Sequence, residues 1–165
     1  MEELISHVDE KDELIDYRPR SEFYKSEMIH RTVWVLLFNS LWQMLIQKRS
    51  ENKKESPWLR SCSVSWGVGI EDYETAAKRE TKEELGIDVE VRKLFKYKRN
   101  RKYSNPYFKE VYEATHDWPL TIQEEEIAEI LRADVERIEK DIQENPHKYT
   151  EWFKKLLQIY LQDGR

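Results

Sequence analysis

Three glutamates stand close together near the middle of the chain, at a spacing that suits metal chemistry. Glu80, Glu83 and Glu84 occupy positions i, i+3 and i+4, and in an α-helix this spacing places their side chains on one face. Carboxylates this close repel one another unless a cation lies between them. Because Mg²⁺ and Mn²⁺ prefer hard oxygen ligands, the spacing predicts a divalent-metal site of the kind that holds phosphates and polarises an attacking water. The alternative is an acidic helix face in solvent.

A helix must present these glutamates, and the flanking residues predict one from Asp72 to Leu85. Asp72 is a suitable N-cap, and Glu74 lies in the first turn, where the positive end of the helix dipole favours an acid. Gly86 follows at the position where a residue with positive φ commonly ends a helix.

The rest of the chain alternates strand-like and helix-like segments. Apolar, β-branched and aromatic runs predict strands at 32–38, 44–47, 89–97 and 107–112, and residues 4–20 predict a small N-terminal hairpin. Helices are predicted at 133–143 and 150–162, with polar loops at 50–57 and 98–106. Strands interleaved with helices predict a single α/β domain over residues 1–165.

The segment around the glutamates resembles the Nudix box, G-x5-E-x7-R-E-U-x-E-E-x-G-U, in which U is a bulky aliphatic residue. The box would span residues 65–87, and the matching residues are Glu71, Arg79, Glu80, Glu83, Glu84, Gly86 and Ile87. Composition alone would produce six exact matches with a probability on the order of 10⁻⁴. Other segments, among them 19–22, 29–31, 45–50 and 145–153, are similar to one Nudix subgroup, the isopentenyl-diphosphate isomerases. The resemblance covers about residues 5–160.

The resemblance implies a Nudix-type α/β/α sandwich with a mixed sheet. It also implies a hydrolase that uses Mg²⁺ or Mn²⁺ to cleave a pyrophosphate link in a nucleoside-diphosphate-type substrate. The implied metal ligands are Glu80, Glu83 and Glu84, and the implied catalytic residues are Glu83 and Glu80, with the general base left open between them. The remaining matches have structural roles: Arg79 would pair with Glu71 and orient the loop, and Gly86 would end the helix.

The sequence departs from the family pattern just before the helix. Counting back from Glu71 places the box glycine at Ser65, and Trp66 stands where the subgroup has a glycine. The cysteine used by the isomerases falls at position 64 or 65 rather than at Cys62, and their downstream glutamate falls near Tyr107. Two alternatives therefore stay open: an isomerase-like enzyme, and a catalytically degenerate Nudix domain that binds a nucleotide or a protein.

Further side chains are candidates for binding substrate. Lys48 and Arg49 end a predicted strand and could hold phosphate oxygens, although ordinary surface charge is an equal alternative. Trp66 could stack on a base or cover a substrate. Glu110 and Glu126 are candidates for a further acid from a later part of the chain, and solvent-exposed loop residues are the alternative for both.

Composition limits the classes of partner. The net charge of −5 disfavours generic binding to nucleic acid or an anionic membrane. We expect no signal peptide, because residues 1–10 are acidic and lack an apolar run, and no membrane span, because no run of 18 apolar residues occurs. A single cysteine, Cys62, indicates a small buried residue in a cytoplasmic protein. The expected partner is a small-molecule diphosphate, and a homodimer is left open.

Overall fold

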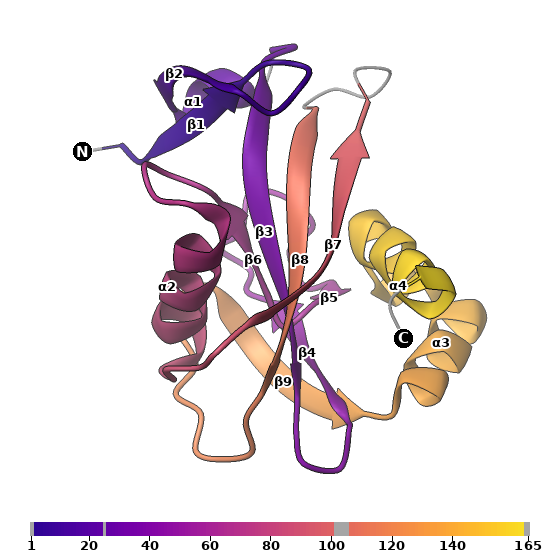
Figure 1. Ribbon diagram of the computed structural model, residues 1–165. Helices are drawn as coiled ribbons and strands as arrows, with labels where there is room; N and C mark the ends of the chain where they lie inside the picture. The colour runs from indigo at the N-terminus through magenta and orange to yellow at the C-terminus, as the bar shows by residue number, and fades with distance from the viewer. Residues whose placement is uncertain (1, 25, 101–105, 164–165) are drawn as a thin grey trace.

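The described residues, 2–24, 26–100 and 106–163, form a nine-stranded sheet between two layers of helices (Figure 1). In the computed structural model the strands are β1 (Leu4–Val8), β2 (Leu14–Pro19), β3 (Ile29–Phe38), β4 (Met44–Arg49), β5 (Arg60–Ser61), β6 (Val64–Gly67), β7 (Arg92–Arg99), β8 (Tyr107–Thr115) and β9 (Ile127–Ala133). The helices are α1 (Arg20–Phe23), α2 (Tyr73–Leu85), α3 (Val135–Glu144) and α4 (Glu151–Asp163), with a 3-10 helix at Pro146–Lys148. Helix α2 covers one face, and α3 and α4 cover the other. The predicted α/β/α sandwich is confirmed.

Strand β3 is the centre of the sheet. It runs parallel to β8 from His30 opposite Tyr107 to Phe38 opposite Thr115, and antiparallel to β1, β4 and β6. The sheet is therefore mixed, as predicted. Side chains alternate between faces along a strand, so a strand covered on both faces is a nearly continuous apolar run, as β3 is in its second half.

Two apolar cores lie on the two faces of the sheet. The core beneath α2 contains Val33 and Val35 of β3 together with Ala76 and Leu85 of the helix. The core beneath α3 and α4 contains the alternate β3 residues and the apolar stripe of α4, with Phe153 fully buried. Burying one such side chain stabilises the fold by roughly 2–3 kcal/mol. No helix among the described residues is long and apolar enough to span a membrane.

Three predictions about elements need correction. The strand predicted from Val89 begins at Arg92, where pairing with β8 starts opposite Glu113. Strand β9 was not predicted, because charged residues interrupt its apolar pattern; it is held by pairing with β4 along its whole length. Ala133 therefore belongs to β9, and α3 begins after its N-cap Asp134. The loop predicted at 98–106 overlaps the end of β7, and its residues 101–105 lie outside the described residues.

Candidate active site

Helix α2 begins and ends as its sequence predicts. Asp72 Oδ1 accepts a hydrogen bond of 2.8 Å from the backbone N–H of Thr75, which caps the N-terminus. Gly86 has φ +68° and its N–H donates to the Lys82 carbonyl at 2.9 Å. A Cβ on Gly86 would lie 2.8 Å from Thr121 Cβ, so both the backbone conformation and the neighbouring chain require glycine here.

The three glutamates do not share one environment. Glu80 and Glu84 are 2% and 3% exposed, whereas the Glu83 side chain is 54% exposed. The prediction that the three carboxylates lie on one face is therefore met by the i, i+4 pair alone, because Glu83 is rotated toward solvent. Charged side chains are rarely buried without a counter-charge, so the burial of two carboxylates marks this part of α2 as a site.

Glu84 is held by β4 and lies near a second acid. Gln47 Nε2 donates to Glu84 Oε2 and to the Ser63 carbonyl, both at 3.1 Å. Burial raises the pKa of Glu84 to about 8, with Lys53 lowering that pKa and Glu126 raising it. Lys53 and Glu126 form an ion pair with each other. Of the two candidates for a further acid, Glu126 therefore acts on this site.

Arg79 gathers the other carboxylates of the motif. Its Nη2 and Nε donate to Glu71 Oε1 at 2.6 and 3.2 Å, which is the ion pair that the resemblance implied. Its Nη1 also pairs with Glu80 and lies 3.2 Å from Glu83 Oε2. Burial raises the pKa of Glu80 to about 8; Arg79 opposes that shift, and Glu84 adds to it. One guanidinium thus orients three acids around the helix.

The loop before α2 is hydrogen-bonded at the point where it departs from the family pattern. Strand β6 pairs with β3, with Trp66 opposite Val33, and the Val68 N–H then donates to the Arg31 carbonyl at 2.9 Å. A Cβ on Gly69 would lie 2.9 Å from Glu71 Oε2. Gly69 therefore leaves room for the carboxylate that Arg79 binds.

The donor chemistry at Glu80 and Glu84 fits a divalent cation. Two buried carboxylates one helical turn apart are stabilised by a positive charge beside them. In the described part of the chain, however, no three His, Cys, Asp or Glu side chains are arranged to hold a metal ion. The predicted third ligand, Glu83, is directed to Arg79 instead.

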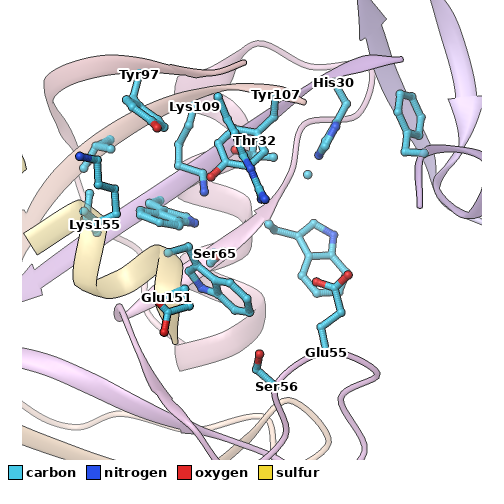
Figure 2. Close-up of a pocket in the computed structure, with 18 of the residues that line it drawn as sticks. His30, Thr32, Glu55, Ser56, Ser65, Tyr97, Tyr107, Lys109, Glu151 and Lys155 are labelled. Atoms are coloured by element: carbon cyan, nitrogen blue, oxygen red, sulfur yellow. The ribbon is translucent and has the colours of Figure 1, made fainter. Parts of the chain in front are cut away.

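A cavity of about 840 Å³ lies on the α4 side of the sheet. The glutamates of α2 do not line it, but Lys53 and Arg49 do, and their charges lower the pKa of Glu84. Figure 2 shows side chains of β3 and β8 converging there with the loop that carries Glu55 and Ser56 and with α4, which carries Glu151 and Lys155. Eight aromatic side chains, six cationic ones and two carboxylates line it. An excess of positive charge among aromatic walls suits an anionic ligand with an organic group.

The structure separates the two basic residues predicted to bind phosphate. Arg49 lines the cavity, and its guanidinium donates to the Glu55 carbonyl at 3.1 and 2.9 Å. Lys48 is absent from the cavity lining; its Nζ lies 3.9 Å from Glu129 and 5.5 Å from the centroid of Trp58. The geometry therefore leaves Arg49 as a candidate for phosphate binding and places Lys48 elsewhere.

Trp66 lines the cavity and its indole is approached by two cations. The Arg20 guanidinium is 3.9 Å and Lys53 Nζ is 4.6 Å from the centroid of a Trp66 ring. The indole Nε1–H donates to Glu3 Oε1 at 2.7 Å. Lys53 lines the cavity and pairs with Glu126, and its charge lowers the pKa of Glu84.

Sequence reasoning missed three side chains of this region: Gln47, Lys53 and Lys109. Lys109 left one signal: it alternates with Tyr107 and Val111 and so shares their face of a predicted strand. Glu110, the neighbouring candidate acid, points the other way and binds Lys93 Nζ at 2.5 Å and the Tyr112 hydroxyl at 2.6 Å. It does not join the carboxylates of α2.

Comparisons with known proteins give a consistent result. A sequence model of the NUDIX domain matches residues 28–153. A Methanosarcina mazei protein named prenyl-diphosphate phosphatase is 37% identical over 133 residues, which are 81% of this chain and 74% of that protein. An isopentenyl-diphosphate Delta-isomerase of Aromatoleum aromaticum is 25% identical over 158 residues, 92% of this chain and 83% of that protein. The crystal structure of DR0079 from Deinococcus radiodurans shares the fold, with a TM-score of 0.82, 23% identity and coverage of 99% of this chain and all of that one.

Proposed function

The chain belongs to the Nudix family and is a pyrophosphohydrolase of that family, and on that premise we propose that it is a divalent-metal-dependent enzyme that cleaves a pyrophosphate link in a nucleoside-diphosphate-type substrate. One observation carries the proposal. Glu80 and Glu84 are buried one turn apart on α2, and Lys53, whose charge lowers the pKa of Glu84, lines a cationic, aromatic cavity large enough for a nucleotide.

Glu80 and Glu84 are the side chains proposed to hold the cation, as Mg²⁺ or Mn²⁺. Gln47 fixes the orientation of Glu84, and Glu126 is the nearby carboxylate that adds negative charge. When bound, such a cation offsets the charge that develops on phosphate oxygens during hydrolysis.

The remaining polar residues have roles that follow from their positions. Glu83 is exposed and restrained by Arg79, so it can accept the proton of an attacking water; Glu80 is the other candidate base. Arg49 and Lys53 line the cavity and can bind phosphate oxygens. Trp66 can pack against the organic group of the substrate.

The decisive experiment measures phosphate release with Mg²⁺ or Mn²⁺ from a panel of nucleoside-diphosphate compounds. Glu84→Gln should lower kcat/KM by about a hundredfold or more. The matched control is Glu74→Gln, which removes an exposed acid from the same helix and should leave the rate unchanged. Absence of turnover across the panel, together with equal Mg²⁺-induced thermal shifts for wild type and Glu84→Gln, would refute the proposal.

A prenyl diphosphate is the second substrate class for the panel, because a relative is named prenyl-diphosphate phosphatase and because eight aromatic side chains line the cavity. This alternative keeps the same carboxylates and changes only the organic group that the cavity accepts.

Isomerase chemistry fits the site less well. Cys62 is fully buried in the core beneath α4, and burial raises the pKa of its thiol to about 12. Tyr107 lines the cavity where the isomerases are expected to have a glutamate. Incubation with isopentenyl diphosphate and a search for the allylic isomer tests this alternative directly.

A non-catalytic binding domain predicts a different metal response. Mg²⁺ should then leave the melting temperature unchanged, whereas a bound cation stabilises the folded state by mass action. We also propose a cytoplasmic location and a small-molecule partner. The proposal holds for a monomer and for a homodimer.

A further inference from the structure

Lys109 is a buried lysine for which the described residues provide no hydrogen-bond or ion-pair partner. It is 4% exposed, lines the cavity, and its Nζ lies 3.2 Å from the centroid of a Trp34 ring and 4.2 Å from that of Tyr107. Figure 2 shows the side chain projecting from its strand into the cavity beside Tyr107 and Thr32. An amino group held among aromatic rings keeps its N–H donors available to a ligand.

Two neighbouring polar atoms on the same face are also unpaired. Trp34 Nε1 and His30 Nδ1 are buried without a hydrogen-bond partner among the described residues, and both residues line the cavity. In the parallel pairing of β3 and β8, His30 lies opposite Tyr107 and Thr32 opposite Lys109, so alternation brings all these side chains to one face. Lys109, Trp34 and His30 thus bring three unpaired polar groups to the face of the sheet that lines the cavity.

Unpaired polar groups in the wall of a cavity favour a ligand that supplies their partners. A saturated or prenyl chain offers no acceptor and would leave Lys109 and Trp34 desolvated and unbonded. A planar heterocycle offers ring nitrogens and carbonyl oxygens in the plane, and faces that stack on aromatic walls. The partly buried cations Lys53 and Arg49, whose charges act on Glu84, suit the phosphates instead.

We propose that Lys109 is a specificity-determining residue: with Trp34 and His30 it binds acceptor atoms on the organic group of the diphosphate substrate and so selects a nucleobase-like ring over a hydrocarbon chain. This inference rests on the proposed function for the identity of the diphosphate. It assigns to Lys109 contact with the part of the ligand that is not cleaved.

The test compares two ligands that share a diphosphate and differ in the organic group. kcat/KM is measured with Mg²⁺ for a nucleoside diphosphate and for farnesyl diphosphate, using wild type, Lys109→Met and the control Lys155→Met, which removes an exposed lysine from the cavity wall. Lys109→Met should reduce the preference for the nucleotide about tenfold, the value of one buried hydrogen bond. Lys155→Met should change that preference less than twofold. Lys109→Gln retains donor groups and should restore part of the preference.

Binding without turnover separates this inference from the proposed function. Calorimetry measures the binding of a nucleoside monophosphate, farnesyl monophosphate and inorganic pyrophosphate. Lys109→Met should weaken the binding of the nucleotide and leave the binding of pyrophosphate unchanged. If no diphosphate is hydrolysed but this pattern holds, the proposed function fails and the inference stands. Equal losses for all three ligands, an unchanged preference in Lys109→Met and Lys109→Gln, or no nucleotide binding by wild type overturns the inference.

Discussion

Replacing Arg79 with methionine is expected to destabilise the fold by about 2–3 kcal/mol. Removing one partner of a buried ion pair costs about 3–5 kcal/mol, and the partial exposure of Arg79 lowers that value. The loss arises because Glu71 and Glu80 would keep their partly or fully buried carboxylates without the guanidinium that now pairs with both. The methionine preserves most of the apolar length of the side chain.

A double-mutant cycle isolates the contribution of the Arg79–Glu71 pair. Two N–H groups of Arg79 donate to one oxygen of Glu71, and charge-assisted hydrogen bonds contribute about 1.5–3 kcal/mol when buried. Because the pair is partly exposed, we expect a coupling free energy of about 1–2 kcal/mol between Arg79→Met and Glu71→Gln. Unfolding in urea followed by tryptophan fluorescence measures the four free energies.

The control for this cycle lies on the same helix. Lys78 Nζ and Glu74 Oε1 form an exposed i, i+4 pair at 3.0 Å, for which the expected coupling is below about 0.5 kcal/mol. A coupling at Arg79–Glu71 no larger than the control value would refute the argument that Arg79 orients the acids of the motif.

Three further predictions concern the same elements. Gly86→Ala should cost about 1–3 kcal/mol in urea unfolding, because alanine at φ +68° is strained and its Cβ would meet Thr121; full stability would contradict this. Burial lowers the pKa of His30 to about 3, so from pH 6.5 downward the unfolded chain binds a proton that the folded chain refuses. Wild type should therefore lose about 2 kcal/mol of stability between pH 7.5 and 5 relative to His30→Asn. Burial lowers the pKa of Lys109, so Lys109→Met should raise the melting temperature at pH 7, and the gain should shrink as the pH approaches 10.5.

Local sequence was sufficient for the part of the site that one helix builds. Asp72 and Gly86 define the ends of α2 through contacts within a few residues, and the spacing of Glu80 and Glu84 follows from helix periodicity. The same periodicity placed Glu83 with them, since three residues and four residues both return to one side of a helix. Which of the three glutamates is buried depends on how α2 is oriented against the sheet, and that orientation is a tertiary property.

The parts of the site that could not be predicted depend on residues far apart in the chain. Gln47 meets Glu84 across 37 positions, and Lys53 meets Glu126 across 73. Lys109 reaches the cavity because β8 pairs in parallel with β3. Strand β9 was missed for the same reason: its pairing with β4 compensates for a charged, weakly patterned sequence.

The structure of the altered loop is weaker evidence for an inactive enzyme than the loop sequence alone. Residues 65–70 lack the expected box glycine, yet β6 is paired with β3 and both remaining glycines have a packing role. A Cβ on Gly67 would lie 3.0 Å from Ile5 Cδ1, and one on Gly69 would meet the Glu71 carboxylate. The loop is therefore rebuilt around Glu71 and the N-terminal hairpin, which keeps Arg79 and its acids in position. Both proposed metal ligands, Glu80 and Glu84, are present and buried, so the altered loop alone is weak evidence that the domain is degenerate. Stabilisation by Mg²⁺ of wild type but not of Glu84→Gln would favour the enzyme.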